Sequence, residues 1–160
     1  MSGGLAVAEV LGRFGLEGVT SAYYWTSPED RSPAFWAFRA FRNFDGKGGR
    51  FLDWTLPVKG STTLTSAFAS RDSEGRRVVA IVLNLSALTP LAPTLSLQGC
   101  GAVASVRVHG YTGGAAGFNE LPISTGEPIA LSLAPYSITV VDITTTPLNA
   151  TAQAPHGPSH

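Results

Sequence analysis

The sequence predicts a mainly β chain, an antiparallel Greek-key β-sandwich preceded by a short helix–strand–helix segment of the type found in α/β barrels. Two patterns carry this prediction. Residues 4–25 show helical periodicity and then a short β-branched and aromatic run, whereas residues 52–144 contain only short apolar or alternating runs between turn signals. We therefore expect three regions: the helix–strand–helix segment with its glycine-rich loop (1–51), the sandwich (52–144) and a disordered Thr/Ala/Pro-rich tail (145–160).

The first predicted element is a helix over residues 5–14. Leu5, Ala8 and Leu11 recur at helical spacing, and Gly15 is typical of a helix end. The run VTSAYYW (19–25) is short and rich in β-branched and aromatic residues, which predicts a strand. The two elements form half of a βα unit, without the partners that would complete it.

A second helix is predicted over residues 33–43. Ser32 is suited to the N-cap and Pro33 to the first helical position. One side of this helix is aromatic, while its arginines lie opposite. So many aromatic side chains on a short helix need a large surface to cover them. This side is therefore a candidate interaction face, made of Phe35, Trp36, Phe38 and Phe41.

Short strands account for the rest of the predicted fold. The run 77–85 is apolar on both faces, which indicates a central strand, and it follows a charged hairpin tip. The even spacing of strands and turns is typical of an antiparallel sandwich or barrel. The strands expected are 52–58, 64–70, 77–85, 93–97, 103–111, 129–133 and 137–143.

The bulk composition fits one compact domain with a small appendage. Of the 160 residues, 44% are hydrophobic, and 11 Lys+Arg balance 11 Asp+Glu. A chain with so few charges, in balance, gives no reason to expect nucleic acid or an anionic membrane as a partner. No apolar run reaches the ~18 residues of a membrane-spanning helix.

The cysteine and histidine residues argue against a disulfide-bonded or a metal-binding protein. Cys100 is the sole cysteine, so no intramolecular disulfide can form. His156 and His160 lie four residues apart, but the prolines at 155 and 158 prevent the helix that a metal pair would need. We expect neither a metal nor a cofactor. The first ten residues lack the basic region of a signal peptide, so the localisation stays open.

Three segments resemble family-44 glycoside hydrolases. They are SGGLAVAEVLGRFGLEGV with AYYW (2–19 and 22–25), AFRAFRNFDGKGGRF (37–51), and the closing run LAPYSITVVDI (133–143). In that family a (β/α)8 barrel is joined to a β-sandwich formed largely by the C-terminal part of the chain. The resemblance, which covers roughly residues 2–144, implies that residues 1–51 are a remnant of the barrel and that the sandwich follows.

The resemblance gives no catalytic residue that can be carried over to this chain. Retaining glycosidases need two carboxylates about 5–5.5 Å apart. In the family, an Asn-Glu-Pro-like motif supplies the acid/base, and the nucleophile ends the barrel strand just before the Ser-Gly-Gly-Leu-like run. Neither motif occurs in this sequence. The parent would be a secreted endo-β-glucanase-like hydrolase, and an extracellular location would follow from it.

Aromatic side chains are the candidate carbohydrate contacts. In the resembled family the residue matching Trp25 lies near the sugar, at the end of the last barrel strand. Trp54 follows the glycine loop, and two aromatics flank the loop 113–117. The alternative for each of them is ordinary packing in the sandwich. The candidates are Tyr24, Trp25, Trp54, Tyr111 and Phe118.

Two polar features are interpreted as structural. His109 lies on a predicted strand without the nucleophile elbow that a hydrolase triad would need. Asp45 is expected to cap its own loop, with Arg50 as its ion partner. The glycines beside them lack the spacing of a phosphate-binding loop and are better explained by turns.

The sequence leaves three functions open. The first is a non-catalytic carbohydrate-associated β-sandwich, either a carbohydrate-binding or an accessory domain of a cellulase-like glycoside hydrolase that acts on β-glucans. The second is a structural module whose aromatic helix forms a homo-oligomer or docks on a barrel. The third is an enzymatic activity that the motifs do not reveal.

Overall fold

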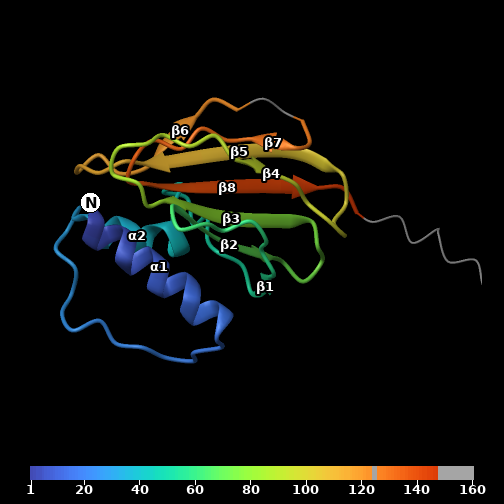
Figure 1. Ribbon diagram of the computed structural model, residues 1–160. Coiled ribbons are helices and arrows are strands. Elements are labelled where there is room, and N and C mark those ends of the chain that lie inside the picture. Colours follow the sequence, from blue (N-terminus) through green and yellow to red (C-terminus); the bar gives the residue numbers. More distant parts are fainter. Residues whose placement is uncertain (124–125, 148–160) are drawn as a thin grey trace, which may run out of the picture.

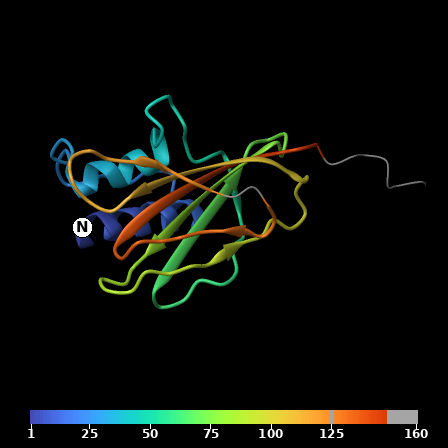
Figure 2. The same ribbon diagram turned by 90° about the horizontal axis from the view of Figure 1, so that it is seen from above.

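The computed structural model describes residues 1–123 and 126–147 and has three layers (Figure 1). A six-stranded antiparallel sheet, in the order β1-β2-β3-β8-β5-β6, forms the middle layer. Two helices cover one face, and a two-stranded sheet of β4 and β7 covers the other (Figure 2). The elements are α1 (Ser2–Leu16), α2 (Pro33–Arg42), β1 (Trp54–Leu56), β2 (Thr65–Arg71), β3 (Arg77–Asn84), β4 (Thr94–Leu95), β5 (Val103–Tyr111), β6 (Asn119–Leu121), β7 (Ile129–Ala130) and β8 (Ser137–Thr145). The predicted mainly β, antiparallel sandwich is confirmed.

β3 lies inside the sheet, as its sequence predicts. It pairs with β2 from Arg71↔Val78 to Thr65↔Asn84, and with β8 on its other side. Seven of its eight residues are buried. A strand that is covered on both faces has no solvent side, which is why its apolar residues run continuously rather than alternating.

The two faces of the sheet belong to two separate cores. Alternate residues of the same strands point to opposite faces, so β3 contributes Val79, Ile81 and Leu83 to one core and Val78, Ala80 and Val82 to the other. The helices close the first core, and the β4–β7 layer closes the second. The helix-side core is completed by Leu5, Ala8, Ala37, Ala40, Phe41, Phe44, Phe68, Tyr111, Ile138 and Val140.

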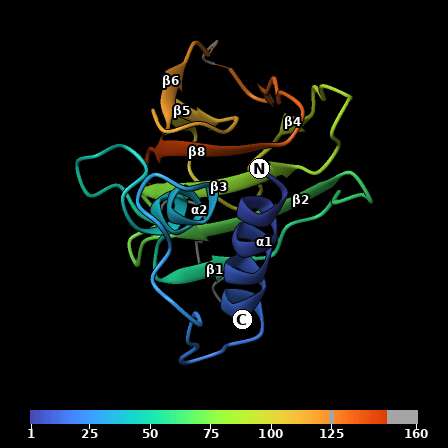
Figure 3. The ribbon, with the colours of Figure 1, turned by 90° about the vertical axis from the view of Figure 1, so that its left-hand side faces the viewer.

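α2 starts where the sequence predicts, whereas α1 starts at Ser2, three residues before the predicted helix 5–14, and continues through Gly15 to Leu16. The Oγ of Ser32 accepts a hydrogen bond from the Phe35 N–H at 3.2 Å, and Pro33 occupies the first turn of α2. α1 packs beside α2 on the same face of the sheet (Figure 3). Close approach requires glycine at two points of α1, because a Cβ on Gly4 would meet Pro33 and a Cβ on Gly12 would meet the Phe68 ring. Neither α1 nor α2 is long and apolar enough to span a membrane.

Residues 19–25 do not form the predicted strand. The segment has no regular secondary structure and is exposed throughout. A strand needs a hydrogen-bonded neighbour, and none of the described strands pairs with this segment. β-branched and aromatic content therefore predicted a strand where the described chain offers no partner, and that prediction is wrong.

Two further differences concern short or terminal segments. β6 is a three-residue edge strand whose sequence, NEL, carries no β signal, and it was not predicted. Of the predicted tail 145–160, Thr145 ends β8. Residues 148–160, including His156 and His160, lie outside the described residues.

Candidate functional site

The loop between α1 and α2 presents aromatic side chains to solvent. Trp25 is 100% exposed and Tyr23 is 97% exposed. Tyr24, between them, packs edge-on against Phe38 of α2, with ring centroids 5.6 Å apart and an interplanar angle of 88°. This contact fixes the loop to the helix layer while its neighbours remain uncovered, so Trp25 is free to stack on another molecule.

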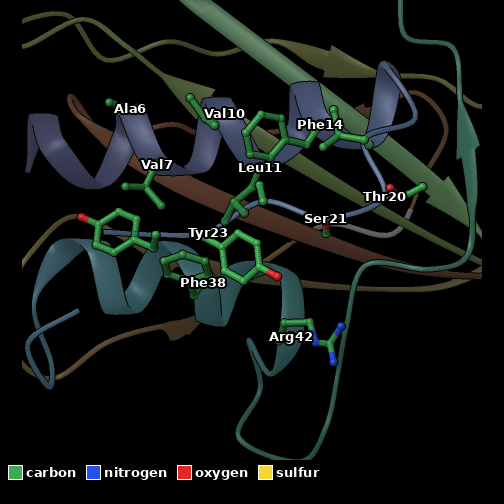
Figure 4. Close-up of a pocket in the computed structure, with 14 residues that line it drawn as sticks. Ala6, Val7, Val10, Leu11, Phe14, Thr20, Ser21, Tyr23, Phe38 and Arg42 are labelled. Carbon is green, nitrogen blue, oxygen red and sulfur yellow. The ribbon is translucent and has the colours of Figure 1, made fainter. Parts of the chain in front are cut away.

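Next to this loop lies an apolar groove of about 780 Å³ between α1, α2 and residues 19–24. Val7 and Leu11 of α1 and Phe38 of α2 point into it (Figure 4). The groove continues to exposed apolar residues on the outer side of α1, among them Val10. A contiguous uncovered apolar surface of this kind marks a place where something packs. The broad hydrophobic content of α1 was its sequence signal, but the prediction placed the interaction face on α2 alone.

Trp54 lies away from both features. It is 57% exposed on β1, one edge of the sheet, with the Arg71 guanidinium 5.9 Å from its ring centroid. Phe118 lies next to β6, the opposite edge. The predicted aromatic residues therefore do not form a single row across the sheet.

Tyr111 and Phe118 belong largely to the helix-side core. Tyr111 is completely buried, in contact with Trp36 at 6.1 Å and Phe118 at 5.6 Å between ring centroids. Burial raises the pKa of the Tyr111 hydroxyl, which has no hydrogen-bond partner in the described part of the chain. No sugar ring can stack on a side chain without exposed surface, so the expectation for Tyr111 is corrected. Phe118 is half-buried by the same contacts.

The chain itself covers much of the aromatic face of α2. Phe41 is buried against Phe51, with ring centroids 5.3 Å apart. Trp36 packs on Tyr111, and Phe35 lies edge-on to Trp36 at 5.1 Å. The large surface that these aromatics need is therefore supplied by the outer face of the sandwich sheet. The Phe38 side of α2 remains open, where it lines the groove.

Two carboxylates near the glycine-rich loop, Asp45 and Asp53, serve as structural partners. Backbone N–H groups of Lys47 and Gly49 each donate to Asp45 Oδ1 at 2.8 Å. Burial raises the pKa of Asp45, but these hydrogen bonds outweigh it and hold the pKa below its ordinary value. Arg50 pairs with Asp53 at 2.8 Å rather than with Asp45, and its hydrogen bond and charge lower the pKa of Asp53. A glycosidase general acid needs a raised pKa, so neither carboxylate fits that role.

Metal binding finds no support in residues 1–123 and 126–147. Among them, no group of three or more His, Cys, Asp or Glu side chains is arranged to hold a metal ion.

Comparison with known proteins relates the chain to carbohydrate-active enzymes. No protein-family model matches it. Endoglucanase A of Paenibacillus lautus is 34% identical over 113 residues, which are 69% of this chain and 16% of that protein. CelM2, a bifunctional glucanase-xylanase from a metagenome library, shares the fold with a TM-score of 0.82 and 29% identity. A family 44 xyloglucanase of Paenibacillus polymyxa superposes with a TM-score of 0.81 at 23% identity. The chain resembles the C-terminal portion of a family 44 glycoside hydrolase.

The resemblance to family 44 covers nearly all of this chain but only part of the relatives. CelM2 matches 90% of the chain and 28% of its own length, and the xyloglucanase matches 90% and 29%. The chain thus spans less than a third of the solved family 44 structures that it matches. The family resemblance predicted from the three sequence segments is confirmed.

Proposed function

We propose that the chain is a non-catalytic, carbohydrate-associated part of a glycoside hydrolase that acts on β-glucans, and that Trp25 contacts the polysaccharide. The observation that carries this proposal is the complete exposure of Trp25 beside an anchored Tyr24. The similar proteins are an endoglucanase, a glucanase-xylanase and a xyloglucanase, which supports a β-glucan as the class of polysaccharide.

The chemistry of the contact is stacking. A pyranose ring has an apolar face of C–H groups, and an indole ring has an electron-rich face that attracts them. Covering the two faces also removes apolar surface from water, which is favourable. Tyr24 would border the same sugar ring. Trp54 is a second and separate candidate contact, and the Arg71 guanidinium already lies near one face of its ring.

The test is affinity electrophoresis in gels that contain carboxymethyl cellulose, xyloglucan or glucomannan. We expect the polysaccharide to retard the chain and Trp25→Ala to weaken binding about two- to tenfold, since an aromatic contact contributes about 0.5–1.5 kcal/mol. Leu88→Ala is the matched control, because Leu88 is also an exposed apolar side chain but lies in the loop between β3 and β4. No retardation in any of the gels, or equal losses in the two variants, would refute the proposal.

The apolar groove supports a second candidate function, the docking of further polypeptide. The solved relatives carry more than twice as much chain beyond the part matched here, and an uncovered groove of about 780 Å³ is a surface that such a segment could cover. Sedimentation velocity over a wide concentration range tests whether a second copy covers it instead. A dimer that Val10→Glu abolishes would favour self-association, and a strictly monomeric chain would exclude it.

A further inference from the structure

A second cavity lies between α2, the loop that follows it and the β5–β6 edge of the sheet. Its volume is about 290 Å³, just below the ~300–1,000 Å³ typical of small-molecule sites. Of the aromatic residues that line it, Trp36 and Phe118 are half-buried, whereas Phe44 is buried. Since Phe38 of the same helix lines the apolar groove, the groove and this cavity lie on different sides of α2.

Unpartnered polar atoms are concentrated at this cavity. Five buried side-chain nitrogen or oxygen atoms lack a hydrogen-bond partner among the described residues, and three of them belong to the cavity residues Trp36, Arg39 and His109. His109 is only 7% exposed, with its ring 5.3 Å from that of Phe44 and its Nε2 unpartnered. Buried polar groups in folded proteins are nearly always satisfied, so these side chains lie in unusual polar surroundings, although the three atoms themselves have almost no accessible surface.

The charges around the cavity restrict what can bind there. Arg39 contributes a positive charge, whereas Asp45 and Glu120 contribute negative ones, and Glu120 lies directly opposite His109 in the β5–β6 pairing. An anion would face the two carboxylates. A metal ion would face the guanidinium, and no group of metal ligands is found in the described residues. A neutral ligand with hydroxyl groups suits the mixture, because Arg39 can donate to an oxygen and Glu120 can accept from an O–H.

We propose that this cavity binds one neutral sugar ring, with its apolar face against the half-buried Trp36 and Phe118 and its hydroxyls toward Arg39 and Glu120. The volume suits a single ring rather than a chain. The site shares no residue with the Trp25 contact, so either can exist without the other.

The positions of the three tryptophans allow a selective test. Trp36 lines the cavity, whereas Trp25 and Trp54 are exposed elsewhere. In the variant Trp25→Ala/Trp54→Phe, Trp36 is therefore the sole source of tryptophan fluorescence. This variant is titrated with glucose, xylose and cellobiose, and with sodium sulfate as an anion probe. We expect a saturable change in fluorescence with at least one sugar and none with sulfate.

Glu120→Ala in the same background tests the assignment of the site. We expect it to weaken sugar binding about tenfold or more, because a hydrogen bond to a charged group is lost. Glu74→Ala, at the exposed β2–β3 hairpin, is the matched control and should leave binding unchanged. Glu120 is exposed on an edge strand, so its loss should not unfold the chain, which circular dichroism verifies. The proposal is overturned by no saturable response to any sugar, by a response to sulfate, or by equal binding in the two variants.

Discussion

At the residue scale, Asp142 has the most extensive set of charged contacts. It lies on β8, is 4% exposed, and bridges to arginines on both neighbouring strands. Arg77 Nε and Nη2 donate to its two carboxylate oxygens at 2.7 and 3.1 Å, and Arg107 Nη2 donates at 2.7 Å. One carboxylate therefore ties together β3, β8 and β5.

Replacing Asp142 tests this role. Asp142→Asn keeps the shape but removes the charge that both arginines need, so we expect a loss of about 1.5–3 kcal/mol in the free energy of unfolding. Denaturant unfolding measures it. Asp53→Asn removes a carboxylate from an exposed Arg50 pair and should leave the stability nearly unchanged. Equal losses in the two variants would contradict a special role for Asp142.

His109 gives the chain a second residue-scale property, a dependence of stability on pH. Burial lowers its pKa below the ordinary 6.5, with smaller opposing effects of nearby charges such as Glu120. Below pH 6.5 the unfolded chain binds a proton that folded His109 binds less readily. The contribution of His109 to the free energy of unfolding is therefore complete above pH 6.5 and is lost as the pH falls through its lowered pKa.

The pH effect can be isolated by substitution. We expect stability, measured by denaturant unfolding, to fall between pH 7 and 5, and to fall less in His109→Phe. Asp45 and Asp53 have pKa values lowered from 3.8, so their contributions are lost only at more acidic pH. Identical pH profiles for the two proteins would refute the assignment to His109.

At the scale of elements, the sequence predicted those elements whose local pattern agrees with the packing around them. Ser32 caps α2 through its own side chain, and the continuous apolar run of β3 matches its burial on both faces. The prediction failed for residues 19–25, whose β propensity is not matched by a neighbouring strand. It also failed for β6, which exists because β5 pairs with it at Val108↔Leu121 to Gly110↔Asn119 and not through its own composition.

The candidate site, too, was only partly predictable from the sequence. The family resemblance pointed to Trp25, which is fully exposed, but the sequence could not show that Tyr111, equally aromatic, would be covered by Trp36. Burial of an aromatic residue depends on which elements meet over it. That information lies in the packing of α2 on the sheet, which no local pattern encodes.

α1 offers a test of that packing. Gly12 faces Phe68, whose buried ring a new Cβ would strike, so Gly12→Ala should destabilise the fold by about 1–3 kcal/mol. Gly15→Ala on the same helix meets only Thr55 Oγ1 at 4.0 Å and should stabilise by up to ~1 kcal/mol through helix propensity. Thermal and denaturant unfolding compare the two. An unchanged or raised stability of Gly12→Ala would rule out close helix–sheet contact at Gly12.

At the scale of the whole molecule, the helices and the sheet share one core. Sheet residues such as Phe68, Ile81 and Val140 are covered by the helix layer. The division at residue 51 that sequence patterns predict therefore cuts through a packed interface. A fragment of residues 52–147 would expose that face to water.

We expect this fragment to be insoluble, or to lack cooperative unfolding, whereas the full chain unfolds in one transition. Solubility, near-ultraviolet circular dichroism and denaturant unfolding make the comparison. A soluble fragment with a well-dispersed NMR spectrum would mean that the sandwich folds without its helices.

The place of β8 in the sheet has a consequence for biosynthesis. Of the described strands, β8 is the last to be translated, yet it lies between β3 and β5. While the ribosome adds the residues between β3 and the end of β8, on the order of seconds at ~5–20 residues per second, both strands have an edge without a partner. Such edges attract other strands. A nascent chain that stalls or terminates before residue 137 would keep them open permanently, and it should be a preferred client of chaperones and proteases.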